Sequence, residues 1–278
     1  MRIGDVHYRS VWMEEDPGIV KVIDQRKLPF EFSTIDLQTS DDAFHAIKDM
    51  VVRGAPLIGV TAAFGLYLAA LKSNADNWCE EVKQAGEKLG SARPTAVNLA
   101  YALELMAGEV NCAGSREGMI ERLFHMAARL AEDEVIRCRK IGEHGVSLVE
   151  EIYLEKRDTG NILTHCNAGW LACVDYGTAT APIYLAHDRG IPVHVWVDET
   201  RPRNQGARLT SYELGAHGVP HTVIVDNAGG HLMQNNEVDL VIVGSDRTTR
   251  KGDAPSRYPT FTTKGWHRCR GQDVSAGR

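Results

Sequence analysis

Reactive side chains directly follow a short apolar segment in the middle of the chain. Asn161–Thr164 has the length and flanks of a buried strand, and His165, Cys166 and Asn167 come next, where the backbone turns towards a helix. In an open parallel α/β sheet, ligands bind in the crevice at the carboxyl ends of the strands. Cys166 is therefore a candidate catalytic residue, although a lone cysteine is more often a small buried hydrophobic side chain.

Three more apolar segments in the second half of the chain each end in an acidic side chain. They lead into Asp198, Asp226 and Asp246, and helical segments separate them. This alternation is the pattern of a parallel, Rossmann-like sheet. One acidic strand end could be an ordinary helix N-cap, but four polar ends in succession predict one shared pocket.

Two arginines stand at predicted helix starts in the first half of the chain. Arg53 is followed by Gly54, Ala55 and a proline, and Arg93 is followed directly by a proline. The N-terminus of a helix favours negative charge, and two such arginines suit a phosphate better than one does. Each alone is more simply explained as a solvated arginine at a helix joint.

The sequence lacks the marks of common cofactor sites. No GxGxxG motif follows the first strand of the sheet, and no Walker A motif is present. The carboxylates come one per strand without a suitably spaced histidine, which argues against a metal. We expect no cofactor and no metal, and a small anionic ligand.

Composition limits location and partners. The 278 residues are 43% hydrophobic and 24% charged, with a net charge of -6, which indicates neither a nucleic-acid nor a membrane-surface partner. The six cysteines show no CxxC spacing, and no leader-like segment precedes the first domain. The longest apolar run, Leu57–Leu71, contains two glycines and is shorter than the ~20 residues of a membrane span. We expect a cytoplasmic protein with reduced thiols.

The predicted fold is α/β with two domains. Residues 1–155 should form a small, mostly helical domain with a few short strands, including Ile19–Asp24 and Phe30–Asp36. It should end in a long helix over Glu117–Leu154, or in two helices joined near Gly142. Residues 156–278 should form a Rossmann-like parallel sheet domain, incomplete at its C-terminal end.

Five ordered blocks carry a resemblance to a known family. The blocks are RGAP at Arg53–Pro56, SARPTAVNL at Ser91–Leu99, THCNAG at Thr164–Gly169, DETRPRNQGARLT at Asp198–Thr210 and VGSDR at Val243–Arg247. With these blocks, the chain resembles methylthioribose-1-phosphate isomerases from about Ile19 to Asp253. Wider relatives are ribose-1,5-bisphosphate isomerase and the regulatory α, β and δ subunits of the translation-initiation nucleotide-exchange factor.

The resemblance implies a reaction and a set of site residues. It implies isomerisation of 5-methylthioribose 1-phosphate to 5-methylthioribulose 1-phosphate in methionine salvage, by a cytoplasmic homodimer without a metal or cofactor. Asp246 would be the acid/base, and Cys166 would assist transfer between C2 and C1. An Asp that acts as an acid near pH 7 needs a raised pKa, which an apolar pocket would provide. The substrate-binding positions would be Arg53, Gly54, Ala55, Arg93 and Gln205.

The end of the chain departs from the family pattern. Family members continue after Gly-Asp with an Asn-Lys pair that binds substrate, whereas Ser256 and Arg257 occupy those positions here. Arg257 could still offer charge to a phosphate, but this exchange is not conservative. Residues 254–278 form an atypical tail without apolar periodicity, which suggests a truncated or frame-shifted C-terminus. The homodimer would then depend on whether this part folds.

Two alternatives therefore stay open. One is a non-catalytic regulatory or ligand-sensing protein on the same scaffold, which an incomplete pocket would favour. The other is a ribose-1,5-bisphosphate isomerase, which needs basic groups for a second phosphate, and the sequence shows no clear additional cluster. Fold alone does not choose among these relatives.

Overall fold

A computed structural model describes residues 1–15, 18–73, 76–111 and 115–245. The chain divides into two compact units. The first, called here the sheet unit, comprises Met1–Tyr8, Arg137–Trp170 and Tyr176–Arg278, and the second, the helical unit, comprises Arg9–Ile136 and Leu171–Asp175. One long helix contributes to both units, and the domain boundary expected at residue 155 stays a prediction.

In its described residues, the helical unit combines a small antiparallel sheet with four complete helices and the first part of the long helix. The three strands are in the order β3-β4-β5. Instead of starting at Phe30, as expected, β5 starts at Thr34, because Phe30 and Glu31 both donate backbone hydrogen bonds to the Lys27 carbonyl in a turn. The elements are β3 (Val11–Met13), β4 (Val20–Ile23), β5 (Thr34–Leu37), α1 (Ser40–Lys48), α2 (Ala55–Lys72), α3 (Trp78–Ser91) and α4 (Val97–Asn111).

Helix α2 is the core of the helical unit. By length and composition alone it could cross a membrane, but 72% of its residues are buried inside the protein. A helix that is apolar all round is a buried one, and α2 packs on α1, α3 and α4. Its two glycines serve this packing: a Cβ at Gly59 would lie 2.8 Å from the Asn98 carbonyl oxygen, and one at Gly65 would lie 2.7 Å from the Ala43 Cβ.

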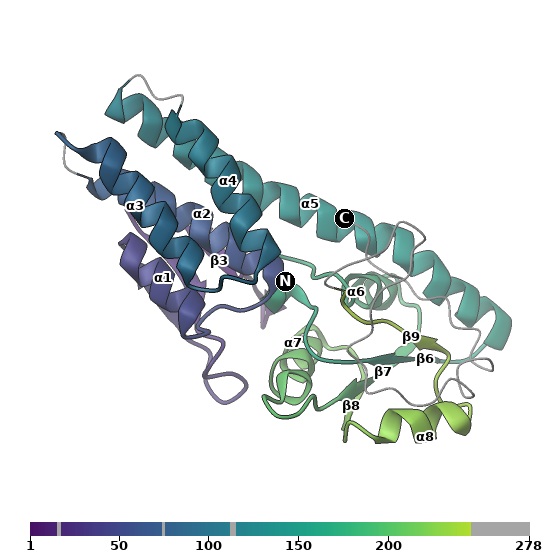
Figure 1. Cartoon of the computed structure of the whole chain (residues 1–278). Coiled ribbons are helices and arrows are strands. Elements are labelled where there is room, and N and C mark those ends of the chain that lie inside the picture. The colour runs from purple at the N-terminus through teal and green to yellow at the C-terminus, as the bar shows by residue number, and fades with distance from the viewer. Residues whose placement is uncertain (16–17, 74–75, 112–114, 246–278) are drawn as a thin grey trace. The chain divides into compact units, whose positions relative to one another are not determined.

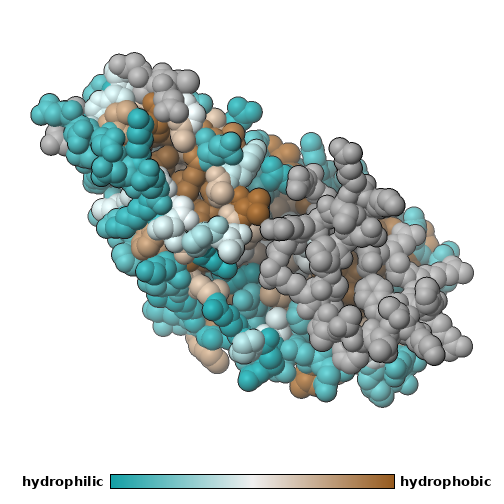
Figure 2. All heavy atoms as spheres, in the orientation of Figure 1, coloured by the Kyte–Doolittle hydropathy of each residue, from teal (hydrophilic) through white to brown (hydrophobic). Residues whose placement is uncertain are grey.

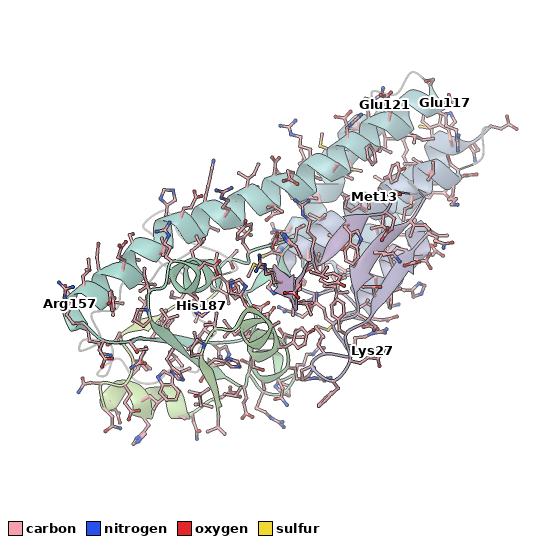
Figure 3. All side chains as sticks on the ribbon, turned by 180° about the vertical axis from the view of Figure 1, so that it is seen from behind. Met13, Lys27, Glu117, Glu121, Arg157 and His187 are labelled. Atoms are coloured by element: carbon pink, nitrogen blue, oxygen red, sulfur yellow. The ribbon has the colours of Figure 1, made fainter. Side chains whose placement is uncertain are left out.

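Helix α5 (Arg116–Lys156) is continuous, which decides between the two arrangements predicted for this segment. Figure 3 labels Glu117 near its start and Arg157 just after its end. Gly142 does not interrupt the helix. Instead, Gly142 and Gly145 bring α5 close to α6 (Ala181–Asp188), because a Cβ at Gly142 would lie 2.7 Å from Leu185.

The sheet unit contains the expected parallel sheet. Its order is β8-β7-β6-β9, and all neighbours are parallel. The strands are β6 (Gly160–Thr164), β7 (Val193–Asp198), β8 (His221–Ile224) and β9 (Leu240–Val241), with helices α7 (Ser211–His217) and α8 (Ala228–Gln234) and the short hairpin β1 (Arg2–Ile3) and β2 (Val6–His7). The expected α/β fold is confirmed. Its incompleteness at the C-terminal end concerns residues 246–278, which lie outside the described part.

The strand order fixes which helices cover which face of this sheet. The chain moves outward from β6 to β7 to β8 and then crosses back past β6 to β9. Because parallel crossovers are right-handed, the reversal of direction puts α8 on the face opposite α6 and α7. Figure 1 shows α6 and α8 on opposite sides of β6 and β7.

One side of α4 is apolar but exposed. Its inner positions Ala102, Met106 and Val110 are buried, whereas Val97 and Tyr101 are 60% and 55% exposed. Figure 2 shows hydrophobic atoms, in brown, reaching the surface over α3 and α4. Helix α4 is thus less amphipathic than a surface helix usually is.

Candidate active site

The carboxyl ends of β6, β7 and β8 lie side by side. In the register of the sheet, Thr164 pairs with Val197, and Asp198 pairs with Ile224. His165 and Cys166 therefore follow one strand at the level where Asp198 ends the next. Two hydrogen bonds join the segment after β7 to the segment after β8: the backbone N–H groups of Thr200 and Arg201 donate to the Asp226 carboxylate, at 2.6 and 2.8 Å.

Cys166 is held at this edge by three hydrogen bonds. Its backbone is left-handed, with φ of 63°. Its N–H donates to Thr200 Oγ1 at 2.7 Å, its carbonyl accepts from Thr210 Oγ1 at 2.6 Å, and its thiol donates to Gln205 Oε1 at 3.1 Å. Cys166 as a whole is half-buried, and both its backbone and its thiol are hydrogen-bonded.

A π-helical turn brings Gln205 and Thr210 to Cys166. The turn covers Gly206–Thr210 and continues directly into α7. A Cβ at Gly206 would overlap the carbonyl oxygen of Asp198, so only glycine allows this turn to lie against the end of β7. Single π-turns inside α-helices are frequent at functional sites. The sequence predicted a helix here, but not this turn.

Three residues near Cys166 were not predicted as site residues. His165 Nδ1 lies 3.1 Å from Oδ2 of the fully buried Asp198, and Thr200 and Thr210 hold the Cys166 backbone. All three lie in the sequence blocks THCNAG and DETRPRNQGARLT. The blocks were a signal that these positions matter, but the partner of each side chain follows from the tertiary structure.

The predicted acid/base, Asp246, lies outside the described residues, as do Ser256 and Arg257. The chain leading to Asp246 is described as far as Ser245. Val241 of β9 pairs with Leu163 of β6. Gly244 follows Val241 at the same spacing as Cys166 follows Leu163. A Cβ at Gly244 would lie 2.8 Å from the Ala168 Cβ, so Gly244 packs against the Cys166 loop.

The predicted phosphate-binding residues lie at two helix starts within the helical unit. Gly54 is the N-cap of α2, with φ of 97°, and Ala55 is the first residue of that helix. A Cβ at Gly54 would overlap the Ala172 carbonyl oxygen. The side chain of Arg53 is buried, with 8% exposed, whereas Arg93 is half-buried in the turn before α4. A Cβ at Gly59 would lie 2.8 Å from the Asn98 carbonyl oxygen, so the first turns of α2 and α4 are neighbours.

In the described part of the chain, the predicted site residues neither form a metal site nor line the hollow described next. Between residues 1 and 245, outside the short gaps, no three His, Cys, Asp or Glu side chains form a group that could hold a metal ion. A hollow of about 320 Å³ is lined by Tyr67, Phe124, Ile120 and two glutamates that Figure 3 labels, Glu117 and Glu121. No predicted site residue lines it.

Comparison with known proteins identifies the family. Residues 51–262 match the model of the initiation factor 2 subunit family. The chain is 54% identical to a methylthioribose-1-phosphate isomerase of Desulfatibacillum aliphaticivorans, over 94% of this chain and 72% of that protein. It is also 54% identical to one of Methylorubrum extorquens, over 94% of this chain and 70% of that protein.

Two solved structures share the fold. A crystal structure of 5-methylthioribose 1-phosphate isomerase from Pyrococcus horikoshii matches with a TM-score of 0.81 and 35% identity, over 91% of this chain and 72% of that one. A crystal structure described as the delta subunit of translation initiation factor eIF-2B from A. fulgidus matches with a TM-score of 0.77 and 38% identity, over 88% and 70%. The chain belongs to the initiation factor 2 subunit family and, within it, to the methylthioribose-1-phosphate isomerases.

Proposed function

We propose that this enzyme converts 5-methylthioribose 1-phosphate to 5-methylthioribulose 1-phosphate in methionine salvage. The observation that carries the proposal is the anchored Cys166 at the carboxyl end of β6, with Gly244, two residues before Asp246, packed against the same loop. The choice of substrate rests on the relatives, which are named methylthioribose-1-phosphate isomerases.

The strand order supports this pairing of Cys166 with Asp246. In open α/β sheets the ligand crevice lies where the strand order reverses. Here the order reverses between β6 and β9, since the chain first moves from β6 towards β8 and then returns to the other side of β6. Cys166 follows one of these two strands and Asp246 follows the other.

The chemistry needs two groups at that position. The substrate carries a phosphate on its anomeric carbon, so the ring does not open simply to an aldehyde. We propose that Asp246 gives a proton to the ring oxygen and takes part in the later proton transfers. Cys166, whose thiol proton points at Gln205, assists the net shift of hydrogen from C2 to C1. General acid–base catalysis of this kind contributes about 10²- to 10⁴-fold in rate.

The phosphate would bind at the starts of α2 and α4. Arg53 provides a buried cation, and the backbone of Gly54 and Ala55 provides N–H groups at a helix N-terminus. Arg93 would add the second guanidinium. Gln205, Ser256 and Arg257 would complete the substrate contacts, and the reaction would use neither a metal nor a cofactor.

The test is direct. The purified protein is incubated with 5-methylthioribose 1-phosphate, and the ketose is followed by NMR. We expect turnover that falls by at least about 10²-fold in Cys166→Ala and in Asp246→Asn. Cys79→Ala, a half-buried cysteine of α3, and Asp133→Asn, an exposed carboxylate of α5, are the matched controls and should remain active. Full turnover in both site variants would refute the assignment.

A regulatory relative is the second candidate. The observation that favours it is the 38% identity to a structure described as a translation initiation factor subunit. A folded protein that binds 5-methylthioribose 1-phosphate without converting it would support this candidate. Ribose 1,5-bisphosphate, offered in the same assay, tests the third possibility, the bisphosphate isomerase.

Location and assembly complete the proposal. We propose that the enzyme acts in the cytoplasm on a small-molecule sugar phosphate, that it binds neither nucleic acid nor membrane, and that it forms a homodimer if its C-terminal part folds. Sedimentation of the full chain would measure the oligomeric state, and a monomer that turns over substrate would contradict the dimer.

A further inference from the structure

Two hydroxyl groups hold the backbone of Cys166 from opposite sides. The Cys166 N–H donates to Thr200 Oγ1 at 2.7 Å, and Thr210 Oγ1 donates to the Cys166 carbonyl at 2.6 Å. Both distances are at the short end for their kind of hydrogen bond. The two threonines come from different elements, since Thr200 follows β7 and Thr210 ends the π-helical turn.

Each hydroxyl is itself fixed by further contacts. Thr200 Oγ1 donates to the Asp198 carbonyl at 3.1 Å, and its backbone N–H donates to Asp226. Thr210 Oγ1 accepts a hydrogen bond from Asn167 Nδ2 at 3.1 Å, and Thr210 is only 1% exposed. A hydroxyl that both donates and accepts has its rotor set, so neither threonine is free to release Cys166.

The arrangement matters because Cys166 has a positive φ of 63°. A left-handed conformation costs a non-glycine residue free energy, and it persists where the surroundings hold it. In this conformation the thiol donates to Gln205 Oε1 at 3.1 Å, and Gln205 immediately precedes the turn that carries Thr210. The same turn thus holds both the backbone and the thiol of Cys166.

We propose that Thr200 and Thr210 are positioning residues, a hydroxyl clamp that fixes the backbone of Cys166 and aims its thiol for the isomerisation. The inference rests on the proposed function for its turnover assay. Thr200 and Thr210 act through Cys166, and neither is assigned a contact with the substrate.

The first test compares Thr210→Val with Thr210→Ser. Valine keeps the shape of the buried side chain and removes the hydroxyl, whereas serine keeps the hydroxyl. We expect kcat to fall by about 10-fold or more in Thr210→Val, because a small displacement of a reacting group is costly, while KM changes less. Thr210→Ser should restore most of kcat. Thr222→Val on β8 is the matched control, since it removes a hydroxyl that contacts His194 and should leave kcat unchanged.

The second test needs no substrate. Iodoacetamide alkylation of Cys166, followed by peptide mass spectrometry, should be about fivefold faster in Thr210→Val and Thr200→Val, the factor for one lost neutral hydrogen bond. This readout separates the two hypotheses: a wild-type protein without turnover refutes the proposed function, and the alkylation rates still test the clamp.

The folding of the variants and two possible results decide whether Thr200 and Thr210 position Cys166. If Thr210→Val does not fold, Thr200→Val, at a half-buried position, takes its place in both assays. Unchanged kcat and unchanged alkylation in folded valine variants would overturn the proposal, and so would a loss of kcat that serine does not restore.

Discussion

At the scale of single residues, hydrogen-bond partners hold the backbone conformation of Cys166 and lower the pKa of Asp24. Cys166 takes a strained backbone conformation because hydroxyl groups from other elements hold it. Asp24, only 1% exposed in the helical unit, accepts hydrogen bonds from Nε and Nη2 of Arg26 at 2.9 and 2.8 Å. The Arg26 side chain holds the pKa of Asp24 below its ordinary value of 3.8, although burial alone would raise it.

This pKa shift predicts a pH dependence of stability. Between the lowered pKa of folded Asp24 and 3.8, the unfolded chain binds more protons than the folded one, so stability rises with pH. The contribution is fully present above about pH 4 and is lost as pH falls through the folded pKa. We expect Asp24→Asn to lower the free energy of unfolding by about 1 kcal/mol at pH 7, since Arg26 is half exposed to solvent.

Urea unfolding between pH 2.5 and 7 measures this effect. The difference between wild type and Asp24→Asn should shrink at the acid end. Asp133→Asn, an exposed carboxylate on α5, should show no such convergence. A difference for Asp24→Asn that is constant with pH would contradict the assigned shift.

At the scale of elements, glycines decide how closely helices approach their neighbours. Gly142 and Gly145 let α6 pack on α5, and Gly206 lets the π-helical turn lie against the end of β7. In contrast, Gly108 on α4 has nothing within 4 Å of where a Cβ would be. The same residue type is therefore a packing requirement at one position and a helix-weakening residue at another.

A pair of glycine substitutions tests this difference. Gly206→Ala should destabilise the protein by about 2 kcal/mol or more, because the new Cβ overlaps the Asp198 carbonyl oxygen and the turn must shift. Gly108→Ala should stabilise it by about 0.5 to 1 kcal/mol, because alanine loses less backbone entropy in a helix. Denaturant unfolding of both variants measures the two changes in the free energy of unfolding. Equal changes in Gly206→Ala and Gly108→Ala would contradict the assigned packing.

At the scale of the whole molecule, binding should stabilise the fold. A ligand that binds only the folded state at 100 times its Kd adds about 2.7 kcal/mol to the free energy of unfolding. If the starts of α2 and α4 bind the phosphate, 5-methylthioribose 1-phosphate should raise Tm by several degrees. Thermal unfolding with and without this compound measures the shift.

Arg53→Met is the informative variant for that measurement. It should abolish most of the rise in Tm, because the buried guanidinium is the proposed partner of the phosphate. Arg139→Met, which removes a cation paired with Glu143 on the surface of α5, should keep the full rise. An equal rise in both variants would exclude Arg53 as a phosphate ligand.

The alternation of strands and helices, the parallel sheet and the family could be predicted from the sequence, whereas the start of β5 and the π-helical turn could not. Apolar segments with polar ends predict strands of a parallel sheet, because an inner strand such as β6 or β7 is buried along its length and reaches the ligand crevice at its carboxyl end. Five ordered blocks were enough to indicate the isomerase family, and the comparisons confirm it. These features depend on neighbouring residues or on a repeated pattern, so they can be recognised in the sequence.

The tertiary structure alone decided which groups meet. The contact of Gln205 with Cys166 spans 39 residues, and that of Thr210 spans 44, so no spacing rule could have paired them. The π-helical turn depends on the absence of a Cβ at Gly206 against a carbonyl of another element. A glycine in a sequence is compatible with both a helix break and a close contact, and only the tertiary structure shows that Gly142 lies inside the continuous helix α5 and against α6.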